Sequence, residues 1–251
     1  MRDSRRLRAL LLWLIAATFA VFAVFPWIDP AVSALFWSGS RFPVNNNSGI
    51  EFLRDALWNL TLFTFALAVA GMLRAAIRAQ PVAGLPVQLW AYFAATFAMG
   101  PGLVVNLLLK EFWGRARPYQ TSIFGGQKQF TPPWDMTDQC LRNCSFVSGE
   151  VSGTTALAVV MVVAAWHLRD RLSRLTLALV MATAPVLVLL AALQRISAGR
   201  HFLSDAILAA LFTLLVAVQL YRWLIERDGP RRALLRWGAA LHRALLGRDR
   251  T

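Results

Sequence analysis

Residues 175–193 read Leu-Thr-Leu-Ala-Leu-Val-Met-Ala-Thr-Ala-Pro-Val-Leu-Val-Leu-Leu-Ala-Ala-Leu, a largely apolar run without a charged side chain. An α-helix rises 1.5 Å per residue, so a run of this length reaches about 28 Å. The hydrocarbon core of a bilayer is about 30 Å thick. The run is therefore predicted to form a membrane-spanning helix.

Five more runs of similar length and composition lie at Ala9–Trp27, Ala56–Leu73, Pro86–Leu109, Gly153–Leu168 and Ala206–Leu224. Charged residues make up 16% of the chain, against about 25% in soluble domains. The sequence therefore predicts an all-α integral membrane bundle of six transmembrane helices, folded as one domain over residues 1–251. The first run is interpreted as an uncleaved span, because Phe25, Pro26 and Trp27 replace the small residues of a signal-peptide cleavage site. Pro101, between two glycines, is predicted to kink the third run.

Arginine supplies nearly all of the net charge of +13. Such a charge in a soluble protein suggests nucleic-acid binding, but here the arginines stand between the apolar runs and at the chain ends, so no nucleic-acid partner is expected. Most of them fall in segments that six spans place on one side. By the positive-inside rule this side, with both termini, is predicted to be the cytoplasm of a bacterial inner membrane. The tail, about 230–251, has apolar residues at helical spacing and is predicted to lie on the lipid surface as an amphipathic helix, with a solvated tail as the alternative.

Three stretches on the opposite side, which is predicted to be periplasmic, carry the residues of chemical interest. Residues 110–118 read Lys-Glu-Phe-Trp-Gly-Arg-Ala-Arg-Pro, and residues 145–150 read Ser-Phe-Val-Ser-Gly-Glu. Residues 195–205 read Arg-Ile-Ser-Ala-Gly-Arg-His-Phe-Leu-Ser-Asp. Their basic residues lie on the wrong side for the positive-inside rule, and phosphate binding would give them another reason to be there.

The cations of these stretches suit a phosphoryl group. Lys110, Arg117 and Arg195 could surround it, with arginine giving bidentate contacts and lysine a point charge. Ser148 and Gly149 precede a predicted helix, where a hydroxyl and backbone N–H groups can hold phosphate oxygens. The structural alternatives are side chains that reach for lipid head groups and a simple helix cap.

His201 and Asp205 are four residues apart, so on a helix they face the same way. A carboxylate beside an imidazole fixes its tautomer and favours its charged form, which leaves the other ring nitrogen free to attack an electrophile. A structural hydrogen bond is the alternative interpretation. Together with the cations, the pair matches phosphoryl transfer, which depends mainly on positioning and charge stabilisation.

The order and spacing of the three stretches resemble those of the type 2 phosphatidic acid phosphatase (PAP2) family. That family has Lys-x6-Arg-Pro, then Pro-Ser-Gly-His, then Ser-Arg-x5-His-x3-Asp. The matching positions are Lys110, Arg117, Pro118, Ser148, Gly149, Arg195, His201 and Asp205. Gln194 stands in place of the serine, and the resemblance covers about residues 56–225.

This resemblance implies a membrane lipid phosphatase with its active site at the periplasmic face. It implies that His201 is the nucleophile and forms a phosphohistidine, and that Asp205 orients it. The phosphate would be bound by Lys110, Arg117, Ser148, Gly149 and Arg195. The family's lipid phosphatases need no metal or other cofactor, and vanadate can occupy the same pocket.

One position departs from the family pattern, because Glu150 stands where the family has the histidine that protonates the leaving group. Four interpretations remain open. Glu150 caps the fourth span; or it is kept protonated by burial beside a phosphate dianion and donates the proton itself; or the leaving group departs unprotonated, as from a diphosphate; or catalysis has been lost. Loss of a general acid typically slows a reaction by about 10²–10⁴-fold.

The expected partner is a phosphorylated membrane lipid in the bilayer. The Ser-Gly-Glu stretch resembles the branch that contains lipid A phosphatases, so lipid A is the first candidate substrate. Undecaprenyl diphosphate and glycerophospholipid phosphates are the alternatives. A lipid-binding or transport protein with a degenerate pocket is the non-enzymatic alternative, and the hydropathy argues against a soluble haloperoxidase. The sequence does not determine the oligomeric state.

Three further features remain open. Cys140 and Cys144 form either a small disulfide or two free thiols. Segment 37–55 is polar and is predicted to be a surface loop or a lid. Additional cations that could meet a second phosphate or a sugar acid are Arg115, Lys128, Arg142 and Arg200.

Overall fold

A computed structural model describes residues 2–227, 233, 235–240, 242 and 243. Its helices are α1 (Arg2–Val24), α2 (Ile28–Ala34), α3 (Ser48–Arg78), α4 (Val87–Phe97), the π-helical η2 (Ala98–Leu109), α5 (Lys110–Phe112), α6 (Gly149–His167), α7 (Arg174–Ser197) and α8 (Leu203–Leu224). Short 3₁₀ turns are η1 (Pro43–Asn46), η3 (Pro118–Gln120) and η4 (Ser122–Phe124).

Six helical stretches of the described chain are long and apolar enough to cross a membrane, which confirms the predicted all-α bundle of six spans. They are Asp3–Val24, Ser48–Arg78, Val87–Phe112, Gly149–His167, Arg174–Ser197 and Leu203–Leu224. The third span combines α4, η2 and α5 into one continuous stretch. Many of the leucines on the outside of these helices are exposed, as expected for side chains that face lipid.

The predicted distortion at Pro101 takes the form of a π-helix over Ala98–Leu109. Proline has no N–H to donate to the preceding turn, and a wider turn accommodates its ring. The carbonyl of Pro101 accepts a hydrogen bond of 2.7 Å from the side-chain amide of Asn106. The π-helix ends directly before Lys110, so the irregular turn lies beside the first of the three sequence stretches.

Segment 37–55 is not a loop throughout, so that prediction was wrong from Ser48 onward. The side chain of Asn47 accepts a hydrogen bond from the Ile50 N–H at 3.1 Å and caps α3. The cap lies nine residues before Ala56, where the apolar run was predicted to begin. The sequence also gave no sign of α2, which is a short helix of seven residues.

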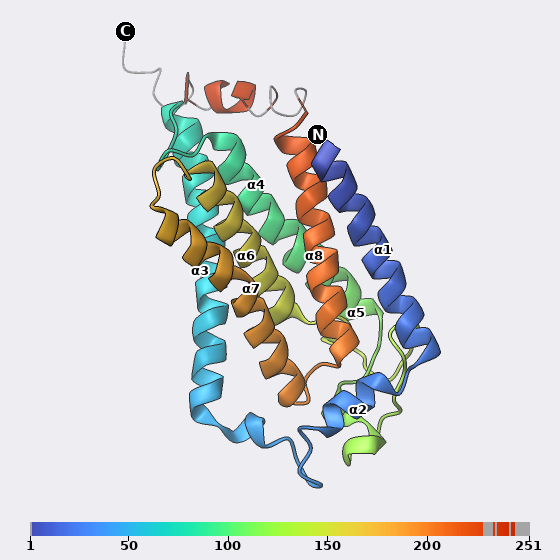
Figure 1. The fold of residues 1–251 in the computed structure, drawn as a ribbon. Helices are drawn as coiled ribbons and strands as arrows, with labels where there is room; N and C mark the ends of the chain where they lie inside the picture. Colours follow the sequence, from blue (N-terminus) through green and yellow to red (C-terminus); the bar gives the residue numbers. More distant parts are fainter. Residues whose placement is uncertain (1, 228–232, 234, 241, 244–251) are drawn as a thin grey trace.

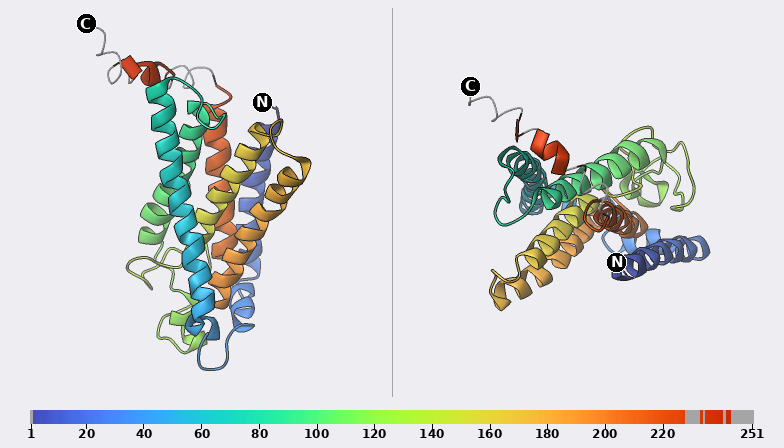
Figure 2. Two further views of the ribbon diagram at one scale, coloured as in Figure 1. Left: turned by 90° about the vertical axis from the view of Figure 1, so that its left-hand side faces the viewer. Right: turned by 90° about the horizontal axis from the view of Figure 1, so that it is seen from above.

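The six spans run side by side with the three sequence stretches gathered at one end (Figure 1). The N-terminal end of α1 and the connection between α6 and α7 lie at the opposite end (Figure 1). α6 packs mainly against α7 and α8, α1 against α8, and α3 against α4. Seen from above, α6 and α7 form one projecting arm, and α1 lies on another (Figure 2).

Two buried clusters hold the bundle together. One contains the aromatic side chains of Tyr92, Phe93 and Phe97 and packs α4 against α3, α6 and α8. The other contains Phe146 from the loop that precedes α6, Leu208 from α8 and neighbouring aliphatic residues. This second cluster stabilises the end of the bundle that carries the sequence motifs.

The predicted amphipathic tail falls largely outside the described residues. Of residues 230–251, those at 233, 235–240, 242 and 243 are described and are helical. Gly238 lies close to Ala76 near the end of α3, and the His242 Nδ1 is within hydrogen-bond distance of the Ile77 carbonyl. These contacts join the described part of the tail to the end of the bundle opposite the sequence motifs.

Candidate active site

Three segments that are far apart in the sequence meet at one end of the bundle. They are the turn after α5, the loop that leads into α6, and the connection between α7 and α8. The Cys144 N–H donates to the Lys110 carbonyl at 3.1 Å, and the Ser148 N–H donates to the Asp205 carbonyl at 3.3 Å. These backbone contacts join the three motifs into one site.

His201 lies in the connection between α7 and α8, and only 1% of it is exposed. Its Nδ1 is 2.7 Å from the carbonyl oxygen of Ser145. A carbonyl can only accept a hydrogen bond, so Nδ1 carries the proton and Nε2 keeps its lone pair. Nε2 faces the carboxylate of Glu150 at 3.8 Å, and is therefore directed into the site.

The neighbouring carboxylates of Glu150 and Asp205 favour the charged imidazole, as predicted, but burial has the larger effect. Burial lowers the pKa of His201, and the nearby carboxylate of Glu150 opposes this effect only in part. Asp205, the expected charge partner, is 4.0 Å from Nδ1. A neutral imidazole is the form that a nucleophile requires.

Asp205 acts through Ser145, and it does not contact the imidazole at hydrogen-bond distance. Its Oδ2 accepts from the Ser145 hydroxyl at 2.5 Å and from the Phe202 N–H at 2.9 Å. Asp205 thus caps α8 and holds the residue whose carbonyl orients His201. The direct orienting contact that the sequence suggested is therefore replaced by a contact through one intervening residue.

Arg115 is fully buried and connects two carboxylates beneath this site. One terminal nitrogen donates to Asp205 Oδ1 at 2.6 Å, and the other donates to Asp29 Oδ2 at 2.7 Å. Its Nε donates to the carbonyl of Thr131 at 2.8 Å. With its three donor nitrogens occupied, Arg115 is not available for a second phosphate, which corrects that expectation.

Asp29 joins this network from α2, the helix that the sequence did not predict. It accepts from the Ser204 N–H at 2.9 Å and from the Ser204 hydroxyl at 2.5 Å. Burial raises the pKa of Asp29, and Arg115 opposes the rise. The two aspartates and the arginine form a buried ion triad, which we call the Asp29–Arg115–Asp205 network.

Glu150 lies in the first turn of α6, but its carboxylate does not cap that helix. The cap is Ser148, whose hydroxyl accepts from the Val151 N–H at 3.4 Å. One Glu150 oxygen instead accepts from Arg195 at 2.5 Å, and the other faces His201. The capping interpretation of Glu150 is therefore wrong, and its carboxylate is part of the site.

The cations surround the same space. Arg195, in the last turn of α7, is only 4% exposed, and its buried Nε has no hydrogen-bond partner among the described residues. Lys110 is also buried and lies within electrostatic reach of Glu150 and Arg195. A Cβ built on Gly149 would lie 3.3 Å from the Lys110 Nζ and 2.9 Å from the side-chain oxygen of Asn106. Gly149 therefore leaves open a small space beside a lysine at a helix N-terminus, as an anion site requires.

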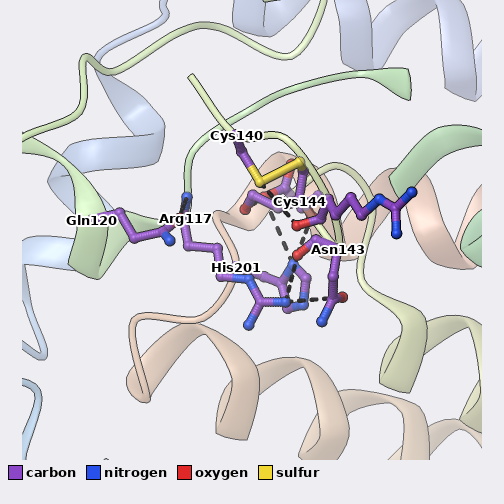
Figure 3. The surroundings of a disulfide bond; sticks show 9 residues. Arg117, Gln120, Cys140, Asn143, Cys144 and His201 are labelled. Atoms are coloured by element: carbon purple, nitrogen blue, oxygen red, sulfur yellow. Dashed lines mark hydrogen bonds and ion pairs between the residues drawn. A yellow bond between two sulfur atoms is a disulfide. The ribbon is translucent and has the colours of Figure 1, made fainter. Parts of the chain in front are cut away.

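Arg117 is held by a loop that a disulfide closes. Cys140 and Cys144 are bonded, which decides between the two states that the sequence left open. Within this loop, Asn143 accepts from Arg117 Nη2 through its carbonyl at 2.8 Å and its side-chain oxygen at 3.1 Å. Figure 3 shows the Arg117 guanidinium directed at Asn143.

The site therefore contains all eight side chains or backbone positions that the sequence singled out, and several that it did not. The residues that sequence reasoning missed are Asp29, Asn106, Asn143 and Ser145, together with the structural role of Arg115. A buried Asp or Arg next to a motif residue carries no periodic signal in a single sequence. Only Ser145 and Arg115, which lie inside the quoted stretches, offered a hint.

A comparison with family models finds a match to the PAP2 superfamily over residues 88–228, which is more than half of the chain. The chain belongs to the PAP2 superfamily. The matched region contains all three motifs but not α2, so Asp29 lies outside it.

Curated relatives extend this similarity beyond the PAP2 region. The lipid A 4'-phosphatase of Rhizobium leguminosarum is 33% identical over 226 residues, which cover 82% of this chain and 91% of that protein. That of Rhizobium etli is 34% identical over 227 residues, covering 82% of this chain and 83% of that protein. That of Francisella tularensis subsp. novicida is 36% identical over 135 residues, covering 52% and 58%. No solved structure matches the chain significantly. Membership of this PAP2 group makes the protein a phosphatase.

The state of His201 predicts the pH dependence of this PAP2 enzyme. Burial lowers the pKa of the imidazole below its ordinary value of 6.5, so the neutral form persists to lower pH. The second ionisation of the substrate phosphate is measured separately, and the profile is corrected for it. In the corrected profile, kcat/KM should decrease only below pH 6.5. An acid limb above that value would mean that the imidazole is held in its charged form.

The disulfide loop predicts a selective effect on phosphate affinity. Cys140→Ser opens the loop and frees Asn143, so Arg117 loses two acceptors that hold its guanidinium. The KM for the substrate should rise about three- to tenfold, in the range expected for the net contribution of one ordinary hydrogen bond. Unfolding temperature serves as the control for folding. An unchanged KM would show that the loop does not position Arg117.

Proposed function

We propose that the protein removes the 4'-phosphate of lipid A through a phosphohistidine on His201, at the periplasmic face of a bacterial inner membrane. The observation that carries the proposal is the geometry of His201, whose Nδ1 lies 2.7 Å from the Ser145 carbonyl oxygen and whose Nε2 faces Glu150 at 3.8 Å, among the cations of the site. The names of the Rhizobium and Francisella relatives support the substrate.

Binding of a phosphate dianion would rearrange one contact. In the free site Arg195 donates to Glu150, and its Nε has no partner among the described residues. A phosphate can accept hydrogen bonds from both Nη1 and Nε of Arg195, in a bidentate contact. The displaced carboxylate of Glu150 would then lie beside a dianion, and this repulsion favours its protonated form. Substrate binding thus prepares Glu150 to act as an acid.

The first chemical step forms a bond between His201 Nε2 and phosphorus and breaks the bond from phosphorus to the sugar oxygen. Glu150 gives its proton to that oxygen, so the sugar leaves as an alcohol. The imidazole becomes positively charged, and the Nδ1–H bond to Ser145 keeps it in place. Lys110, Arg117 and Arg195 stabilise the charge that develops on the phosphoryl oxygens.

The second step uses water in place of the sugar. Glu150, now a carboxylate, accepts a proton from the water as its oxygen attacks phosphorus. The bond from phosphorus to Nε2 breaks, His201 returns to the neutral form, and inorganic phosphate leaves. No metal or other cofactor takes part in either step. The same carboxylate acts first as acid and then as base.

Two features support the proposed orientation. The bonded Cys140 and Cys144 suit an oxidising compartment. The arginines near the end of α3 and between α6 and α7 suit the cytoplasm. A cysteine introduced at Lys128 should react with a membrane-impermeant reagent added to the periplasm. Reaction only after the inner membrane is opened would reverse the orientation.

A substrate panel tests the proposed function. The purified protein is given lipid A, undecaprenyl diphosphate and phosphatidic acid in the same detergent, and phosphate release is measured. The highest kcat/KM is expected for lipid A, with the 4'-phosphate lost. A higher value for either of the other lipids would contradict the proposed substrate. No release from any of them would leave a lipid-binding protein with an inactive pocket.

Glu150→Gln predicts how the proton reaches the leaving group. The glutamine keeps the shape of the side chain but cannot donate a proton to the sugar oxygen. Release from lipid A should slow about a hundredfold or more, within the range for loss of a general acid. Release from a diphosphate, whose leaving group needs less protonation, should slow far less. Equal slowing of both substrates would remove Glu150 as the acid, and Glu111→Gln serves as the matched control.

A further inference from the structure

A cleft of about 380 Å³ lies between α3 and α7, within the membrane-spanning part of the bundle. Five of its thirteen lining residues are leucines, which include Leu53 and Leu57 from α3 and Leu187 and Leu190 from α7, and Arg54 of α3 also lines it. The side chains of Leu53 and Leu190 are 67% and 54% exposed. The cleft therefore opens on the outer surface of the bundle, where lipid chains lie.

The inner end of the cleft reaches the active site. Glu150 lines the cleft, and its Oε2 lies 3.8 Å from Nε2 of His201. Gln194 also lines the cleft, next in the chain to Arg195. A molecule in the cleft could thus have one end in the bilayer and the other end at the cations.

Gln194 is one of the polar residues in walls that are largely apolar, together with Arg54, Thr154 and Ser197. Its Nε2 is buried and has no hydrogen-bond partner among the described residues. A buried donor without a partner is costly, so such groups in native proteins call for an explanation. The ester or amide carbonyl that joins an acyl chain to a lipid head group is an acceptor that such a donor could bind.

We propose that this cleft binds one acyl chain of the phosphorylated lipid substrate, with the Gln194 amide donating to the carbonyl at the root of the chain. The inference rests on the proposed function and adds the site that receives the lipid part of the substrate. A chain that moves from the bilayer into the cleft stays in apolar surroundings throughout. The head group can therefore approach His201 without exposing methylene groups to water.

The role of the cleft is positioning, because an acyl chain gains little binding free energy when it moves from one apolar medium to another. Holding the chain fixes the phosphate in line with Nε2, and such orientation can contribute much of a rate enhancement. A phosphate analogue without a chain, such as vanadate, should bind without using the cleft. This difference separates the cleft from the phosphate pocket in an experiment.

Leu190→Trp fills the cleft and tests the proposal. The expected result is a decrease of about tenfold or more in kcat/KM for lipid A in detergent micelles, with the inhibition constant of vanadate unchanged. Leu179→Trp is the matched control, since Leu179 is an exposed leucine of α7 that does not line the cleft and should have no effect. If Leu190→Trp does not fold, Leu53→Trp fills the cleft from the opposite wall.

Gln194→Met tests the polar contact separately. The methionine keeps the length of the side chain but cannot donate, so the KM for lipid A should rise about fivefold, in the range expected for one hydrogen bond.

Wild-type kinetics with lipid A in both tryptophan variants would overturn the cleft proposal. A matching loss of vanadate inhibition would also overturn it, since the change would then act on the phosphate pocket. If the wild-type protein itself released no phosphate, the proposed function would fail instead.

Discussion

His201→Ala should lower the kcat for phosphate release by at least about ten-thousandfold, the scale seen when the nucleophile of a covalent mechanism is removed. The imidazole Nε2 is the attacking atom in the proposed reaction, and among the described residues no other imidazole lies near the cations. His167 is exposed at the opposite end of α6, and His242 contacts the end of α3. Neither can replace His201.

The loss must be separated from a loss of folding, because His201 is buried and its Nδ1–H bonds to Ser145. Thermal unfolding in detergent supplies that measurement, and His167→Ala provides the matched control with full activity expected. A folded His201→Ala protein with more than about one hundredth of wild-type activity would exclude His201 as the nucleophile.

Arg115→Met should destabilise the protein by about 3–5 kcal/mol, the cost of breaking a buried ion pair by removing one partner. Methionine fills a similar volume but leaves Asp29 and Asp205 facing each other without a cation. Both carboxylates are fully buried, so water cannot replace the lost charge. A lysine would not restore the site, because it cannot supply the forked contacts that the arginine makes to two carboxylates.

Arg142→Met is the matched control for this change, since Arg142 is an exposed arginine in the same region of the molecule. Its stability should equal that of the wild-type protein, measured by the midpoint of thermal unfolding in the same detergent. Equal midpoints for Arg115→Met and the wild type would show that the Asp29–Arg115–Asp205 network does not hold the site together. The activity of Arg115→Met should decrease in proportion to the fraction of the protein that is folded.

The six spans could be predicted from the sequence because a bilayer imposes a length and a composition on each of them. The start of α3 could not, because its first turns carry Glu51, Arg54 and Asp55 and extend beyond the apolar run. α2 escaped prediction for a related reason. It has only seven residues, and its polar contacts with the rest of the chain come from the buried Asp29, while Val32 packs against a buried cluster.

The site shows a similar division. The order of the motifs predicted that Lys110, Arg117 and His201 would meet, because the family resemblance gave three fixed spacings on one side of the membrane. The contact between Asp205 and Ser145 depends on how the loop before α6 folds under α8, which no spacing reveals. The electrostatic balance at His201 likewise depends on complete burial, which a sequence pattern does not quantify.

The central claim is that a phosphoryl group is transferred to Nε2 of His201. The most direct test is rapid acid-free quenching of the enzyme during turnover of lipid A, followed by mass spectrometry of its peptides. The account predicts a phosphate on the peptide that contains His201, absent from His201→Ala. A phosphate on another residue, or turnover at the full rate with no phosphorylated peptide trapped under conditions that preserve phosphohistidine, would contradict it.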